Sequence, residues 1–170
     1  MQDADLFLEL AGIAGVFVGF GALIAVRSGG ASDPFEVAYM RGVVSMGLLT
    51  VIAALAPVIL DRYDLAEHQV WALSSALALV CMVALVGAMA RTPEWATTEE
   101  PIRSRRLAAV ARAAGSLYLL ALAVALIVIV AGIAPDLEAA IYFTAVALIL
   151  LWNAWLLLQL VFRTRLPASE

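Results

Sequence analysis

The chain has 170 residues, of which 65% are hydrophobic and only 14% are charged. Soluble domains are about 45–50% apolar and about 25% charged, so this composition excludes an ordinary soluble domain. The basic residues are ten arginines in a chain of net charge −4. They are clustered beside apolar segments, where anionic lipid headgroups lie, and do not indicate nucleic-acid binding.

Five segments contain no Asp, Glu, Lys or Arg: residues 10–26, 42–60, 69–90, 113–135 and 139–162. A helix rises about 1.5 Å per residue, so roughly 20 residues cross a hydrocarbon core of about 30 Å. The pattern predicts an all-α fold, a polytopic bundle of five transmembrane helices. We expect one transmembrane domain, 1–170, with spans near residues 5–26, 36–60, 69–90, 113–134 and 138–162.

The first predicted helix carries a stripe of small residues at intervals of three or four positions: Gly12, Gly15, Gly19 and Ala22. Residues at this spacing share one helix face. Glycine is costly inside a helix, so such a stripe implies that another backbone comes close. Three interpretations remain open: packing on another helix of the same subunit, a seam between identical subunits, or the lining of a pore.

Glu9 lies near the start of the same helix, close to the glycine stripe. It is the one acidic residue that we expect to enter the membrane, where carboxylates are costly and often functional. It either reaches the outer headgroups or, if the stripe lines a pore, forms an acidic ring at the outer mouth.

The second loop carries a short acidic cluster formed by Asp61, Asp64, Glu67 and His68. Carboxylates and an imidazole can bind a divalent cation weakly. However, a single histidine without a second close partner makes a poor transition-metal site. We therefore expect a solvated loop and no metal site.

The third loop, residues 91–112, is the largest soluble segment. Residues 97–101 read Thr-Thr-Glu-Glu-Pro, which is typical of a helix start, so we expect a short cytoplasmic helix leading into the fourth span. Four arginines follow: Arg103, Arg105, Arg106 and Arg112. They either contact lipid headgroups and hold the topology, or form a docking surface for a protein partner.

The fifth predicted helix places polar and aromatic side chains near the middle of the bilayer: Trp152, Asn153, Trp155 and Gln159. Tryptophan usually prefers the interface, so two near the middle indicate a packed site. We expect Asn153 to form a hydrogen bond with a neighbouring helix. The two tryptophans and Gln159 share a face, which either belongs to the bundle core or lines a pocket for a lipid-like ligand.

The arginines predict the orientation. Five spans place the first loop, the third loop and the C-terminus on one side, and nine arginines lie there: Arg27, Arg41, Arg91, Arg103, Arg105, Arg106, Arg112, Arg163 and Arg165. The other side has only Arg62 and is acidic. The positive-inside rule therefore predicts an outer N-terminus and a cytoplasmic C-terminus.

The sequence contains no Ser/His/Asp, HExxH, CxxC or phosphate-binding arrangement, so we expect neither an enzyme nor a bound cofactor. Abundant Ala, Arg and Gly without lysine is typical of a GC-rich bacterial source, which predicts a multi-pass protein of the bacterial inner (plasma) membrane. One functional hypothesis is a homo-oligomeric channel or transporter-like protein for small cations. The other is a non-conducting scaffold or accessory subunit that docks a protein partner through residues 91–112.

The predicted orientation can be tested with single cysteines in a Cys81→Ala background. An impermeant thiol reagent applied to intact cells should label Asp64→Cys and leave Thr98→Cys unlabelled, because the arginine distribution places these positions on opposite sides. Labelling of Thr98→Cys in place of Asp64→Cys would contradict the orientation.

Overall fold

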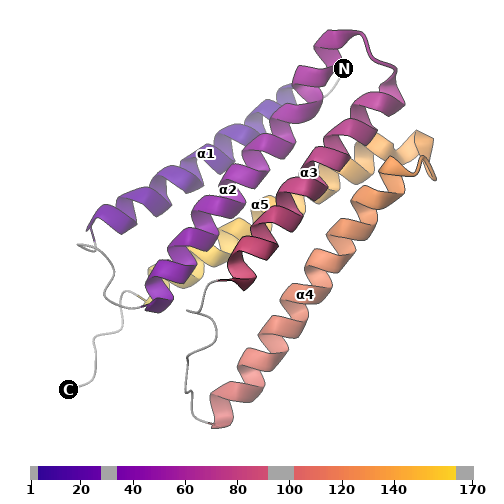
Figure 1. Ribbon diagram of the computed structural model, residues 1–170. Coiled ribbons are helices and arrows are strands. Elements are labelled where there is room, and N and C mark those ends of the chain that lie inside the picture. Colours follow the sequence, from indigo (N-terminus) through magenta and orange to yellow (C-terminus); the bar gives the residue numbers. More distant parts are fainter. Residues whose placement is uncertain (1–3, 28–33, 92–101, 164–170) are drawn as a thin grey trace.

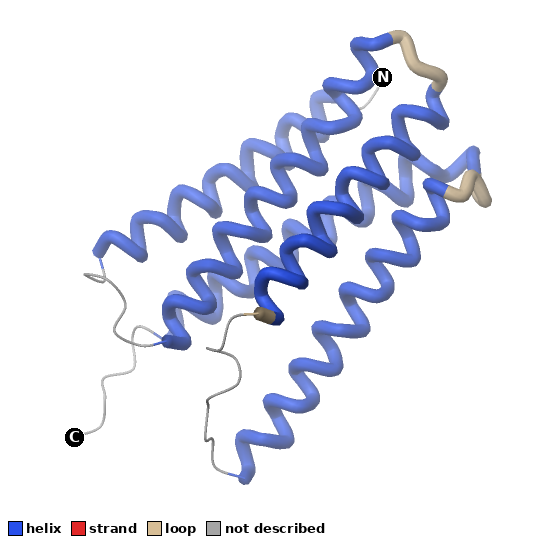
Figure 2. Tube along the Cα trace, in the orientation of Figure 1, coloured by secondary structure: helices blue, strands red, loops and turns tan. Residues whose placement is uncertain are grey.

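The computed structural model describes residues 4–27, 34–91 and 102–163 of the chain. In this described part, five long helices run alternately up and down and form one bundle (Figures 1 and 2). They are α1 (Ala4–Arg27), α2 (Pro34–Leu60), α3 (Glu67–Ala90), α4 (Ile102–Val130) and α5 (Glu138–Arg163). α2 packs against α1, α3 and α5, whereas α4 packs against α3 and α5. The helices α1 and α4 therefore lie at opposite edges of the bundle.

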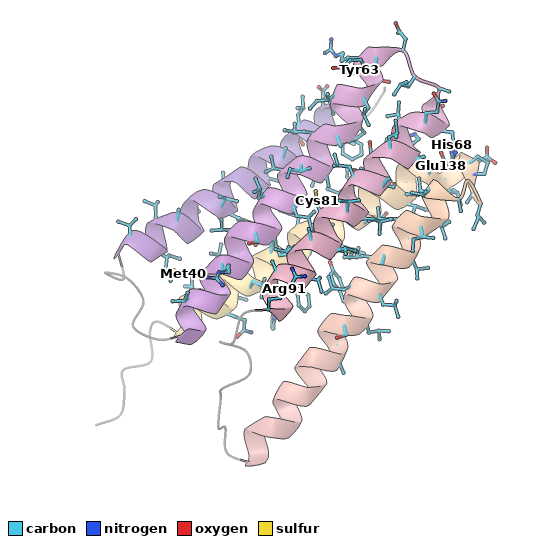
Figure 3. All side chains as sticks on the ribbon, viewed as in Figure 1. Met40, Tyr63, His68, Cys81, Arg91 and Glu138 are labelled. Atoms are coloured by element: carbon cyan, nitrogen blue, oxygen red, sulfur yellow. The ribbon has the colours of Figure 1, made fainter. Side chains whose placement is uncertain are left out.

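Five segments of the described chain are long and apolar enough to cross a membrane, and each consists mainly of one long helix: Ala4–Ile24, Met40–Tyr63, Glu67–Met89, Ala113–Val130 and Pro135–Gln159. The predicted all-α, multi-pass membrane bundle is therefore confirmed. Its orientation stays a prediction. The end that holds the short helices η1 (Asp61–Tyr63) and η3 (Pro135–Leu137) is called the predicted outer end below. Figure 3 shows Tyr63, His68 and Glu138 at this end.

An aromatic cluster fills the core near the predicted outer end. Phe7 of α1, Trp71 of α3 and Tyr142 of α5 are buried, and their ring centroids lie 5.7–6.0 Å apart. Phe143 meets Phe7 edge to face, with centroids 5.6 Å apart. These are favourable distances for aromatic pairs, so the rings hold the first turns of three helices together.

The close contact between α1 and α2 depends on Gly47 and Gly21. A Cβ atom added at Gly47 would collide with Val18 and lie 3.0 Å from the side-chain amide of Asn153. A Cβ atom added at Gly21 would lie 3.1 Å from Cγ1 of Val43. Glycine at these two positions lets the helix backbones approach each other, as is common in membrane bundles.

Helix α4 ends at Val130, four residues before the predicted boundary of its span. Gly132 has a φ of 64°, its N–H donates to the Ile129 carbonyl, and the Ile133 N–H donates to the Val128 carbonyl. This is the Schellman ending, in which a glycine in the left-handed region terminates a helix. At its other end α4 begins at Ile102, and the helix start expected at residues 97–101 lies outside the described residues.

Candidate functional site

The glycine stripe of α1 lies on an outward face of the bundle. Glu9 and all four small residues, Gly12, Gly15, Gly19 and Ala22, are exposed. A Cβ atom added at any of the three glycines would meet no atom of the described residues within 4 Å. In the described bundle α1 therefore packs through another side, with Phe7, Ala14 and Gly21 buried, and the stripe is left uncovered.

Large apolar side chains lie beside the stripe on the same helix. Val16, Phe20 and Leu23 follow at four- and three-residue spacing, and each is more than half exposed. At 3.6 residues per turn, this ridge lies about a quarter of a turn around the helix from the glycines. The outward side of α1 thus carries a groove of small residues next to a ridge of large ones. We call this combination the α1 face.

The four residues singled out on α5 do not form one site. Trp152 stacks on Tyr118 of α4, with ring centroids 4.9 Å apart and an interplanar angle of 19°. Trp155 is 53% exposed, and Gln159 is partly buried. Trp152 therefore packs against α4, whereas Trp155 is exposed. The two tryptophans and Gln159 do not line one shared pocket in the described bundle.

Asn153 is fully buried and is paired with the backbone of α2. In the amide orientation that satisfies both of its polar atoms, Nδ2 donates to the Val43 carbonyl over 3.0 Å. Oδ1 then accepts from the Gly47 N–H over 3.3 Å. Asn153 thus forms the interhelical hydrogen bonds expected of an amide inside the membrane.

A groove of about 310 Å³ lies between α4 and α5, and none of the predicted site residues lines it. Its lining is almost wholly apolar and includes Tyr118, Ala125, Ile141, Thr144 and Leu148. The Thr144 hydroxyl donates to the Ala140 carbonyl of its own helix over 2.7 Å, so toward a ligand its oxygen can act only as an acceptor.

The predicted docking segment coincides with the beginning of α4. Arg103, Arg105, Arg106 and Arg112 lie in the part of α4 that precedes its apolar span, which begins at Ala113. Figure 1 shows this end of α4 extending beyond the end of α3. The segment is therefore helical from Ile102, whereas residues 92–101 of the same loop lie outside the described residues.

An ion pair at the predicted outer end joins α3 to α5. Nδ1 of His68 lies 2.7 Å from Oε1 of Glu138 (Figure 3). The Glu138 side chain is 3% exposed and that of His68 is 49% exposed. Both residues lie in the first turn of their helices. His68 also lies against the α4–α5 turn, because a Cβ atom added at Gly132 would be 3.2 Å from its Cε1.

Among the described residues, no group of three or more His, Cys, Asp or Glu side chains is placed to hold a metal ion. Sequence analysis missed the pairing of His68 with Glu138, since the two are 70 positions apart and no local pattern links them. The only available signal is that both begin helices predicted to start on the same side of the membrane.

Comparison with known proteins gives no matching family model, curated protein or solved structure. The functional argument therefore depends on the geometry of this chain.

His68→Ala tests the contribution of the outer ion pair. Removing the imidazole leaves the buried Glu138 carboxylate without this partner, so the free energy of unfolding in detergent should fall by about 1–2 kcal/mol. In a Glu138→Gln background the same substitution should cost less than about 0.5 kcal/mol, because no buried charge remains to be paired. An equal cost in both backgrounds would show that the pair contributes nothing.

Proposed function

We propose that the chain is a homo-oligomeric membrane protein whose subunits associate through the α1 face, and that it passes small cations between the subunits. The observation that carries this proposal is the outward direction of the glycine stripe. Lipid chains gain little from a smooth helix surface, whereas a second helix can approach its backbone closely and gain van der Waals contact. A second copy of the same chain supplies a suitable partner surface.

The presence of a groove and a ridge on the same helix favours a ring of identical subunits. Since they lie about a quarter turn apart, the groove of one α1 can receive the ridge of the next in a head-to-tail contact. Repeated around an axis perpendicular to the membrane, this contact closes. The exposed carboxylate of Glu9 then lies at one end of the ring of α1 helices. Repeated negative charges there would concentrate cations.

The packed core of each subunit favours an ion path between subunits and not a path through the interior of a single bundle. Phe7, Trp71, Leu126, Tyr142 and Ile149 are all less than 5% exposed and fill the interior from α1, α3, α4 and α5. Widening such a core for an ion would break close packing throughout the subunit. A path lined by α1 helices needs no such change.

The second candidate function is a non-conducting scaffold or accessory subunit, and the arginine-rich beginning of α4 favours it. This helical segment extends beyond α3 and carries four of the ten arginines. Such a segment suits contact with an acidic partner or with anionic headgroups. In this case the α1 face would hold copies of the scaffold together.

Association can be tested with Gly15→Leu, using Gly87→Leu on α3 as the matched control. Both glycines have open space within the subunit, so neither change should disturb the bundle itself. A leucine that separates two packed helices costs about 1–3 kcal/mol, so Gly15→Leu should weaken association about ten- to hundredfold. Mass measurement in mild detergent should show an oligomer for the wild type and Gly87→Leu, and smaller species for Gly15→Leu. A monomeric wild type would contradict the proposal.

Conduction can be tested with Glu9→Gln, using Glu67→Gln as the matched control on α3. Both residues are exposed near the predicted outer end, but only Glu9 lies on α1. In reconstituted liposomes Glu9→Gln should lower cation flux by about tenfold and weaken the preference for cations over anions. The control should change neither. Wild-type flux no greater than in empty liposomes would exclude the channel and leave the scaffold.

A further inference from the structure

Pro57 creates an unpaired acceptor within the α2 helix. Proline has no N–H, so the carbonyl four residues earlier, that of Ala53, lacks its usual helical donor. Both residues are buried in the bundle. No water is present in a bilayer core to pair such a carbonyl, so another group of the protein has to do so.

The hydroxyl of Tyr142 supplies the missing donor. It donates to the Ala53 carbonyl over 2.7 Å, from a residue 89 positions away on α5. Tyr142 is fully buried, and its ring packs against Phe7 of α1 and Trp71 of α3. The aromatic cluster therefore positions the hydroxyl, and four helices meet at one backbone carbonyl.

We propose that Tyr142 is a latch on a hinge at Pro57, closed while its hydroxyl donates to the Ala53 carbonyl. With this hydrogen bond formed, the end of α2 is fixed. Without it, the last turn of α2 and η1 bend as a unit, between Pro57 and the left-handed Asp64, whose φ is 52°. Proline inside a helix is the usual site of such bending.

Tyr142 is also connected to the α1 face through a side-chain contact. Phe7 packs on the Tyr142 ring and lies two residues before Glu9 on the same helix. Resting on the proposed function, the latch would therefore set the position of the Glu9 end of α1 and regulate entry to the path. The hinge itself exists in each subunit, whether or not subunits associate.

A double-mutant cycle measured by amide hydrogen exchange on the full chain in detergent tests the latch. Tyr142→Phe keeps the ring and removes the hydroxyl, so amide exchange across residues 58–63 should become about tenfold faster. Pro57→Ala restores a backbone N–H that can donate to the Ala53 carbonyl. In that background Tyr142→Phe should change exchange by less than about threefold, because the carbonyl is paired without the latch.

One control makes the result specific. Tyr118→Phe removes a buried hydroxyl that has no partner among the described residues, so it should leave exchange at residues 58–63 unchanged. Equal acceleration by Tyr142→Phe in both backgrounds, or none in either, would overturn the latch. The readout requires neither oligomer nor flux, so it is independent of the proposed function.

Discussion

Hydrocarbon offers no partner to a backbone carbonyl, and this constraint organises the bundle around α2 and α5. Pro57 leaves the Ala53 carbonyl without a helical donor, and the Tyr142 hydroxyl of α5 pairs with it. Nearer the opposite end, the buried Asn153 amide of α5 pairs with the α2 backbone at Val43. Two polar contacts thus tie α5 to α2 at two heights. The aromatic cluster supports the first contact and the glycine-lined approach of α1 supports the second.

The sequence predicted the number and type of the helices because charged residues are excluded from the bilayer, so each span appears as a long segment without them. It did not predict which way α1 faces. A helix that is apolar all round carries little amphipathic signal, so an inward glycine and an outward glycine look alike. Gly47 and Gly15 illustrate this: the first permits close packing inside the subunit and the second has open space. The predicted end of the fourth span, residue 134, lies four residues beyond Val130, because the helix-ending role of Gly132 was not predicted. The partner of His68 was not predicted either, since that contact depends on the tertiary arrangement.

The two edges of the bundle, α1 and α4, present different surfaces for contact with other molecules. At one edge, α1 presents small and large apolar residues inside the membrane, with Glu9 near the predicted outer end. At the other edge, α4 extends beyond its span as an arginine-bearing helix. Assembly through the first edge and docking through the second are compatible in one protein. The ion pair of His68 and Glu138 holds the turns between the helices at the predicted outer end, so movement at Pro57 would be confined to the end of α2 and its connection.

The central claim is that a second copy of the chain, and not lipid, covers the α1 face. Disulfide cross-linking in native membranes tests it most directly, with Gly19→Cys and Phe20→Cys placed together in a Cys81→Ala background. These positions lie at the same height on the groove and the ridge, so neighbouring subunits should form a ladder of covalent multimers. The control pair, Val83→Cys and Ala84→Cys, lies on an exposed side of α3 and should form few. Cross-linking through α1 that is no greater than through α3 would contradict the account.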